Sequence, residues 1–199
     1  MEITASVVKT LRDKTNAGMM DCKEALQASD GDFDKAIEYL RKKGMSAATK
    51  RSSRAAKEGV VASYIHMEGK IGVMVEVNCE TDFVAKTEAF RTMARDIAMH
   101  IAALNPTYVK SDDVPEDVLA RERAIYRDQA LAEGKPEKII DKISEGKLRK
   151  FYEEVCLLNQ KFVKDTDITI ETLVKNTIAN TGENIIVKRF ARYQLGEEI

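Results

Sequence analysis

Apolar residues in the first 45 positions recur at helical spacing in three short stretches. The first follows Thr4, the second follows Gly18, and the third follows a turn at 29–32. Asp32 stands where a side-chain oxygen can accept hydrogen bonds from the free amides of a first helical turn, and Gly44 stands where helices commonly end. The pattern therefore predicts three helices, the last closed by Gly44. Their core is marginal by itself, so we expect a larger neighbour to support it.

After Gly59 the period changes to two. Apolar residues alternate with others over residues 71–77, which is typical of a half-buried strand. A β-rich run at 60–66 precedes it, and turn residues at 68–70 join the two. The pattern predicts an antiparallel hairpin, which needs further strands or a helix to be stable. Residues 185–193 offer a third strand.

Helical patterns fill most of the chain between these strands. A clean apolar stripe runs from Phe90 to Leu104, and a last helix is expected near 171–180. The residues that open or divide the other helical pieces are Pro115, Gly134, Pro136 and Gly146. Helices beside a small antiparallel sheet of about three strands indicate an α+β fold class.

The expected organisation has three parts. Residues 1–45 form a three-helix domain, residues 46–57 a basic helical linker, and residues 58–199 an α+β core. The run at 41–57 contains basic residues and no acid: Arg41, Lys42, Lys43, Lys50, Arg51, Arg54 and Lys57. A solvated linker is one interpretation, and an RNA-facing or ribosome-facing surface is the other, because phosphates attract such a run.

Composition narrows the function classes. The net charge of −1 argues against whole-molecule binding to nucleic acid, and the absence of Trp argues against a base-stacking platform. The three cysteines are far apart and odd in number, which argues against a disulfide framework or a zinc site. With no signal peptide and no long apolar stretch, we expect a cytoplasmic protein that does not enter a membrane.

Catalytic and cofactor motifs are missing from the sequence. His66 falls in a predicted strand and His100 in a predicted helix, and we interpret both as structural or surface residues. Cys79 is either a nucleophile or, as is more common, a small buried hydrophobe. We therefore expect no enzymatic activity, no small-molecule substrate, no metal site and no cofactor.

The corner after the second strand contains the most unusual local feature. Thr81, Asp82, Phe83 and Val84 lie between that strand and a helix, so an acid stands beside a large aromatic residue. Loops on rigid scaffolds commonly carry recognition residues. The alternative is structural: Phe83 folds back into the core while Thr81 or Asp82 caps the helix.

Two stretches resemble the elongation factor Ts family. They are residues 11–26 (LRDKTNAGMMDCKEAL) and residues 76–86 (EVNCETDFVAK), and the similarity extends over essentially the whole chain. The resemblance implies a non-enzymatic guanine-nucleotide exchange factor that releases GDP from its partner GTPase, elongation factor Tu. It also implies an N-terminal module similar to ubiquitin-associated domains.

The resemblance suggests site residues as well. The segment Thr81 to Val84 would approach the magnesium site of the partner, with Asp82 and Phe83 as the leading exchange residues. The N-terminal module would pack on the nucleotide domain of the GTPase. Its expected secondary contacts are Arg12, Met19, Met20 and Lys23.

This sequence departs from the family pattern in two ways. Asn16 stands where the family often has Gly, and Asn tolerates the same left-handed backbone. The chain is also short, so we expect no room for the second core subdomain and the protruding coiled-coil hairpin of longer members. A homodimer through the C-terminal half would replace that subdomain. Because Met1 lies almost at the first helix, we expect no transit peptide and a bacterial cytosol.

Overall fold

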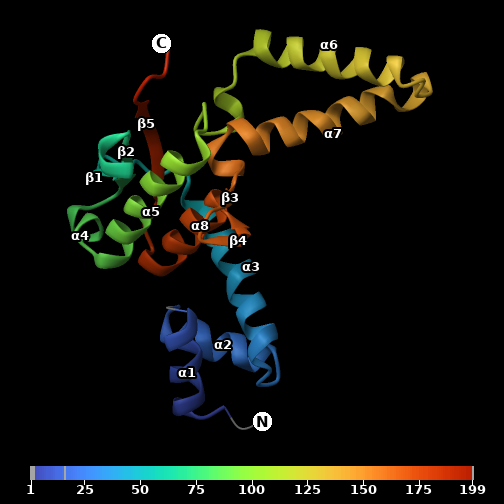
Figure 1. The fold of residues 1–199 in the computed structure, drawn as a ribbon. Helices are drawn as coiled ribbons and strands as arrows, with labels where there is room; N and C mark the ends of the chain where they lie inside the picture. The colour runs from blue at the N-terminus through green and yellow to red at the C-terminus, as the bar shows by residue number, and fades with distance from the viewer. Residues whose placement is uncertain (1–2, 16, 199) are drawn as a thin grey trace. The chain divides into compact units, whose positions relative to one another are not determined.

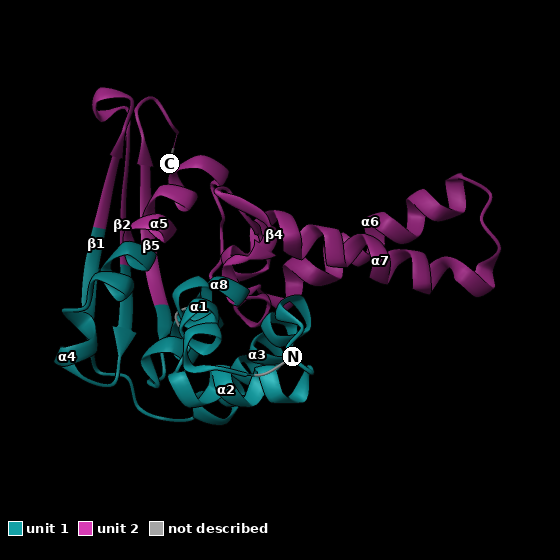
Figure 2. Cartoon of the chain, turned by 90° about the horizontal axis from the view of Figure 1, so that it is seen from below, with its two compact units in different colours: residues 1–62, 76–94, 172–187 teal, residues 63–75, 95–171, 188–199 magenta. Residues whose placement is uncertain are grey.

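The computed structural model describes residues 3–15 and 17–198 and shows an α+β fold (Figure 1). Two compact units share the chain (Figure 2). Unit 1 comprises Met1–Ala62, Glu76–Ala94 and Thr172–Val187. Unit 2 comprises Ser63–Val75, Arg95–Glu171 and Lys188–Ile199. The division cuts the strands of the main sheet, so each unit contains one end of it.

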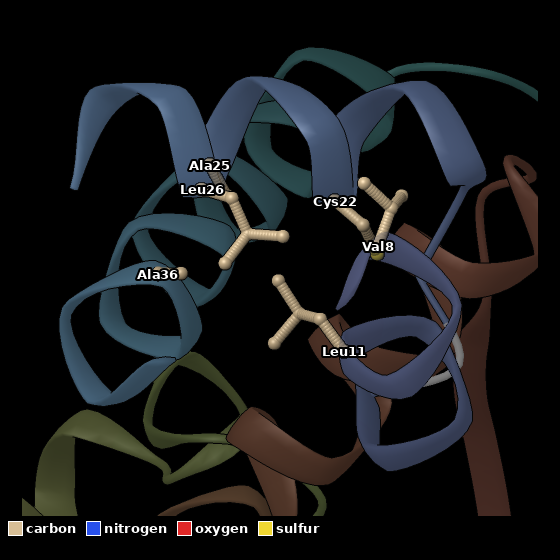
Figure 3. Close-up of a cluster of buried hydrophobic side chains, with 6 residues drawn as sticks. All are labelled: Val8, Leu11, Cys22, Ala25, Leu26 and Ala36. Atoms are coloured by element: carbon tan, nitrogen blue, oxygen red, sulfur yellow. The ribbon is translucent and has the colours of Figure 1, made fainter. Parts of the chain in front are cut away.

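Unit 1 begins with three helices, α1 (Ala5–Thr15), α2 (Met19–Ala28) and α3 (Phe33–Arg51). One face of each contributes to a small core, drawn in Figure 3, whose buried members are Val8, Leu11, Cys22, Ala25, Leu26 and Ala36. The predicted cap of α3 is confirmed, because the Asp32 carboxylate accepts hydrogen bonds from the backbone N–H groups of Asp34 and Lys35 at 3.0 and 3.1 Å. The prediction for Asn16 lies outside the described residues.

The predicted end of the third helix at Gly44 is wrong, because α3 continues to Arg51. Gly44 serves a different purpose. A Cβ atom there would lie 2.9 Å from the Cβ of Ala179, so the missing side chain allows close packing against α8 (Ile170–Thr181). Much of the predicted linker at 46–57 is thus the last turns of α3. The division of the chain at residue 45 stays a prediction.

The main sheet has three antiparallel strands, in the order β1–β2–β5. They are β1 (Glu58–His66), β2 (Ile71–Cys79) and β5 (Ile186–Gln194), and the short 3-10 turn η1 (Met67–Gly69) joins the first two. The predicted hairpin and third strand are confirmed. Gly59 is required where β1 and β2 approach, because a Cβ atom there would lie 2.1 Å from the carbonyl oxygen of Val77.

Two helices of very different length follow β2. The first, α4 (Asp82–Ala85), is a single turn, and the second is α5 (Glu88–Leu104). The predicted apolar stripe of α5 is confirmed from Phe90 to Ile101, with Met93 and Ile97 also buried, whereas its last predicted member, Leu104, is exposed.

Unit 2 contains a helical hairpin that the sequence analysis excluded. After the 3-10 turn η2 (Ser111–Asp113), α6 (Glu116–Ala132) and α7 (Glu137–Val155) pack along each other and project from the rest of the unit (Figure 2). The expectation that the chain has no room for such a hairpin is therefore wrong. The prediction that Gly146 divides a helix is also wrong, because α7 runs through it. Packing between two long helices stabilises them by more than one glycine in a helix costs.

The base of the hairpin is fixed to the rest of unit 2. Its buried residues are Val114, Leu119, Leu148 and Cys156. The backbone N–H groups of Thr107 and Tyr108 both donate to the carbonyl of Val155, at 2.9 and 3.0 Å. The 3-10 turn η3 (Leu157–Asn159) follows and leads into the next strands.

A second, two-stranded sheet, which the sequence pattern does not predict, is formed by β3 (Lys161–Phe162) and β4 (Asp165–Thr169). His100 of α5 is buried beside it. Its Nε2 lies 3.0 Å from Oε1 of Gln160, and its Nδ1 accepts a hydrogen bond from the Val163 N–H at 3.3 Å. Nε2 must therefore donate to Gln160, so His100 is neutral and has a structural role. The interpretation of His100 as structural is thus confirmed.

Candidate functional site

The corner between β2 and α4 displays a large apolar side chain to solvent. Phe83 is 79% exposed although it lies in a helix, while its neighbours Ala85 and Phe90 are buried. The alternative in which Phe83 folds back into the core is wrong. The other part of that alternative is right: Thr81 is the N-cap of α4, and its hydroxyl accepts a hydrogen bond from the Val84 N–H at 3.4 Å.

Asp82, in the first turn of α4, pairs with Lys86 one turn later. Its Oδ2 lies 2.6 Å from Nζ of Lys86. The hydrogen bond from Lys86 lowers the pKa of the Asp82 carboxyl below its ordinary value of 3.8. Because both side chains are substantially exposed, the pair adds little to stability, and a charged group of a partner can displace either member.

Cys79 ends β2 beneath this corner. Its Sγ is buried and lies 3.1 Å from the carbonyl oxygen of Thr81. Burial, together with the charge of Glu183, raises the pKa of the thiol to about 11. The interpretation of Cys79 as a small buried residue is confirmed, because a buried thiol with a raised pKa is a poor nucleophile.

Two residues from the loop before β5 hold this corner, and the sequence analysis did not single them out for a role. Glu183 Oε2 accepts hydrogen bonds from the backbone N–H groups of Glu80 and Thr81, at 3.1 and 3.0 Å. Glu183 Oε1 accepts one from the Thr81 hydroxyl at 2.5 Å. Asn184, which is 2% exposed, donates its backbone N–H to Oε1 of Glu80 at 2.7 Å. Neighbouring residues do not indicate these contacts, because more than 100 residues separate the partners.

The four predicted secondary contacts lie on the N-terminal helices of unit 1. Arg12 of α1 and Met19, Met20 and Lys23 of α2 are all exposed, and Met20 reaches 73%. Within the part of the chain that the structure describes, neither Arg12 nor Lys23 forms an ion pair. The small core beneath them (Figure 3) fixes the helices that present these side chains.

The described residues show no group of three or more His, Cys, Asp and Glu side chains that could hold a metal ion. His66 is exposed at the end of β1, where its ring stacks on Tyr64 with 5.8 Å between ring centroids. Each helix within residues 3–15 and 17–198 is too short or too polar to span a bilayer.

Comparison with known proteins identifies the family. The family model described as Elongation factor TS matches residues 1–197. Elongation factor Ts of Syntrophus aciditrophicus is 74% identical over 199 residues, which cover 100% of this chain and 99% of that protein. Elongation factor Ts of Desulfosudis oleivorans is 60% identical over 195 residues, or 98% of each chain. That of Moorella thermoacetica is 58% identical over 197 residues, or 99% of this chain and 97% of the relative.

The chain therefore belongs to the elongation factor Ts family, whose members act in translation elongation.

Proposed function

We propose that the protein is the guanine-nucleotide exchange factor of elongation factor Tu, which it binds in the GDP state and from which it promotes GDP release. Membership of the family supports the partner and the process. One observation carries the mechanism: Phe83 is 79% exposed on a single-turn helix that is fixed at its start. A large aromatic side chain held in water in this way is typical of a residue that is buried only in a complex.

The exchange mechanism needs only displacement of partner groups. A GTPase holds GDP through phosphate contacts and through a magnesium ion that bridges phosphate and protein oxygens. Insertion of Phe83 between elements of the partner shifts those elements, and magnesium loses the near-ideal octahedral geometry that it requires. Asp82 adds a negative charge beside the phosphates once a partner group has displaced Lys86. No group of this protein forms or breaks a covalent bond, so the protein is not an enzyme.

Thermodynamic linkage sets the size of the effect. If the factor weakens GDP binding, GDP weakens binding of the factor by the same ratio. A thousandfold ratio corresponds to about 4 kcal/mol of coupling. One buried aromatic residue and an extended interface can supply this energy. We propose that Arg12, Met19, Met20 and Lys23 supply part of that interface on the nucleotide domain of the partner.

The decisive measurement is the release rate of fluorescent GDP from elongation factor Tu. We expect wild-type protein to accelerate release strongly and Phe83→Ala to lose most of that acceleration, by about 100-fold, as for a hot-spot residue. Leu131→Ala is a matched control, because Leu131 is also an exposed apolar residue but lies on α6. Failure of folded wild-type protein to accelerate release would overturn the proposal. Equal loss in Phe83→Ala and Leu131→Ala would remove Phe83 from the mechanism.

The alternative function, RNA or ribosome binding through residues 41–57, is less well supported. Three of the seven basic side chains already pair with acids of unit 1: Lys42 with Glu38, Lys43 with Asp21 and Glu24, and Arg54 with Glu80. These pairs reduce the charge that is free to attract phosphates. The alternative predicts binding that falls steeply with salt and does not depend on Phe83.

We also propose a homodimer formed through the open face of the main sheet. In unit 2 this face carries Ile65 and Met74, with Met67, Tyr193 and Leu195 also exposed at the same ends of the strands. A Cβ atom on Gly72 would lie 3.4 Å from Cδ1 of Ile65, so Ile65 covers Gly72, and Met74 points to the same side two residues later. We propose that a second copy of this chain covers the face, since an apolar face is complementary to itself across a two-fold axis.

Sedimentation equilibrium tests the homodimer. We expect wild-type protein to sediment as a dimer and Met74→Glu as a monomer, because a buried unpaired charge opposes association. Leu131→Glu, which places the same charge on α6, should remain dimeric. A monomeric wild-type protein would contradict the proposal.

A further inference from the structure

The loop between α8 and β5 carries a carboxylate that the proposed exchange mechanism has not yet used. Glu183 accepts three hydrogen bonds from the corner that begins α4, two from backbone N–H groups and one from the Thr81 hydroxyl. Hydrogen bonds to a charged acceptor are stronger than those between neutral groups. Glu183 thus determines where the backbone of residues 80 and 81 lies.

The bond from Thr81 also gives its hydroxyl a direction. Because its single proton points to Glu183, the oxygen offers a lone pair to the Val84 N–H and caps α4. A helix of one turn cannot hold its own conformation in water. The conformation of α4 therefore depends on this cap, and Glu183 orients the group that makes it.

Asn184 extends the same set of contacts to the end of α3. Its Nδ2 donates to the carbonyl oxygens of Arg54 and Ser52, at 2.7 and 3.4 Å, while its backbone N–H donates to Glu80. The contacts run in both directions: the Glu80 N–H donates to the Glu183 carboxylate, and the Asn184 N–H donates to the Glu80 carboxylate. Three segments far apart in the sequence are fixed at one point of unit 1.

Phe83 itself contributes nothing to this arrangement. Its side chain is almost fully exposed, so its position follows from the backbone of α4 and not from packing of the ring. A side chain that inserts between elements of a partner must be presented in a defined orientation. A misplacement of about 1 Å can lower a rate about 100-fold.

We propose that Glu183 is a positioning residue for nucleotide exchange, which fixes the Thr81 cap and thereby presents Phe83 to the partner. This inference rests on the proposed function. Loss of Glu183 should affect the maximal rate of exchange more than the affinity for the partner, because the N-terminal contacts are unaffected. The effect should also pass through Phe83 and disappear when Phe83 is absent.

The test measures GDP release from elongation factor Tu over a range of factor concentrations. It gives the maximal rate and the half-saturating concentration for wild type, Glu183→Gln, Phe83→Ala and the double variant. Gln keeps the size of Glu but replaces one acceptor oxygen with an NH₂ donor. Whichever way its amide lies, it cannot accept both from the N–H groups of the corner and from the Thr81 hydroxyl. Glu145→Gln, an exposed glutamate on α7, is the matched control.

We expect Glu183→Gln to lower the maximal rate about tenfold and to change the half-saturating concentration less than about threefold, as for loss of a charged hydrogen bond. The double variant should be no slower than Phe83→Ala alone. Thr81→Val should reproduce the effect of Glu183→Gln, and Thr81→Ser, which keeps the hydroxyl, should restore nearly the wild-type rate.

Three results would overturn the inference. They are an unchanged maximal rate in Glu183→Gln, a further tenfold loss in the double variant, and a wild-type rate in Thr81→Val. A normal loss in Phe83→Ala alongside any of them would leave the proposed exchange function intact. Thermal melting shows whether Glu183→Gln is folded. If it is not folded, the exchange rate of Thr81→Val tests the inference instead.

Discussion

The consecutive helices α4 and α5 place their phenylalanines in opposite environments. Phe90, in the first turn of α5, is completely buried, whereas Phe83 of α4 is 79% exposed. The two residues have the same side chain and are seven positions apart. In α5, burial follows from an apolar stripe four turns long. In α4 no stripe exists, and distant hydrogen bonds set the conformation. One phenylalanine stabilises the fold, and we propose that the other acts on a partner.

The largest expected difference between the two is in stability. Phe90→Ala should lower the free energy of unfolding by about 3–5 kcal/mol, through lost burial and the cavity that remains. Phe83→Ala should change it by less than about 0.5 kcal/mol, because the side chain is already in water. Urea denaturation of both variants measures this. Similar losses of unfolding free energy in the two variants would show that Phe83 is packed in solution. The two phenylalanines would then not differ in their environments.

The second largest effect should be a loss of stability in acid, through His100 of α5. Burial lowers the pKa of His100 in the folded protein below its ordinary value of 6.5. Below pH 6.5 the unfolded chain therefore binds more protons than the folded one, and stability falls as pH falls, by at most about 1.4 kcal/mol per pH unit.

The pH effect can be assigned by substitution. His100→Gln should flatten the dependence of the melting temperature on pH between pH 7 and the onset of carboxylate titration near pH ~5. The exposed His66 provides the control, and His66→Gln should keep the wild-type dependence. A wild-type slope in His100→Gln would show that another group is responsible.

The cap of α4 should have a smaller effect on stability. Thr81→Val keeps the shape of the side chain and removes the hydroxyl, so we expect a loss of about 1 kcal/mol, the usual value of an N-cap. Thr81→Ser should lose much less. Denaturant titration distinguishes them, and equal stabilities for the Ser and Val variants would mean that the hydroxyl does not hold the helix.

The ion pair of α4 should matter least. Lys86→Ala should change stability by less than about 0.5 kcal/mol, because both charged groups are exposed. The pKa of Asp82 should rise toward its ordinary value of 3.8, since the hydrogen bond from Lys86 is the main cause of its lowering. A carboxyl NMR titration measures this shift. An unchanged titration would show that the pair does not form in solution.

Much of the fold could be predicted from local sequence. The stripe of α5, the β1–β2 hairpin and the cap at Asp32 all depend on neighbours within a few residues, so their signals are present in the pattern itself. The roles of two glycines depend on distant residues. The local pattern predicts a helix end at Gly44, whereas this glycine allows close contact with Ala179, far away in the sequence. The pattern also predicts a break at Gly146, but α7 runs through it because α6 packs alongside.

The candidate site was likewise predictable only where it depends on neighbouring residues. Sequence signals indicated the segment from Thr81 to Val84, but they left open whether Phe83 is buried or exposed. The hydrogen bonds that hold this corner come from Glu183, which contacts Thr81 across about 100 residues of chain, so neighbouring residues do not indicate them. The strands β3 and β4 were missed because they are short and show no alternation of apolar residues.

The hydrogen bonds of Glu183 also bear on the order in which the molecule is completed during synthesis. The three N-terminal helices depend on local contacts and can form as soon as their residues are available. The corner with Phe83 cannot reach its final form until residue 183 of 199 has been added to the nascent chain. Long-range contacts of this kind form late, so the corner that carries Phe83 is completed only after about 100 further residues have been translated.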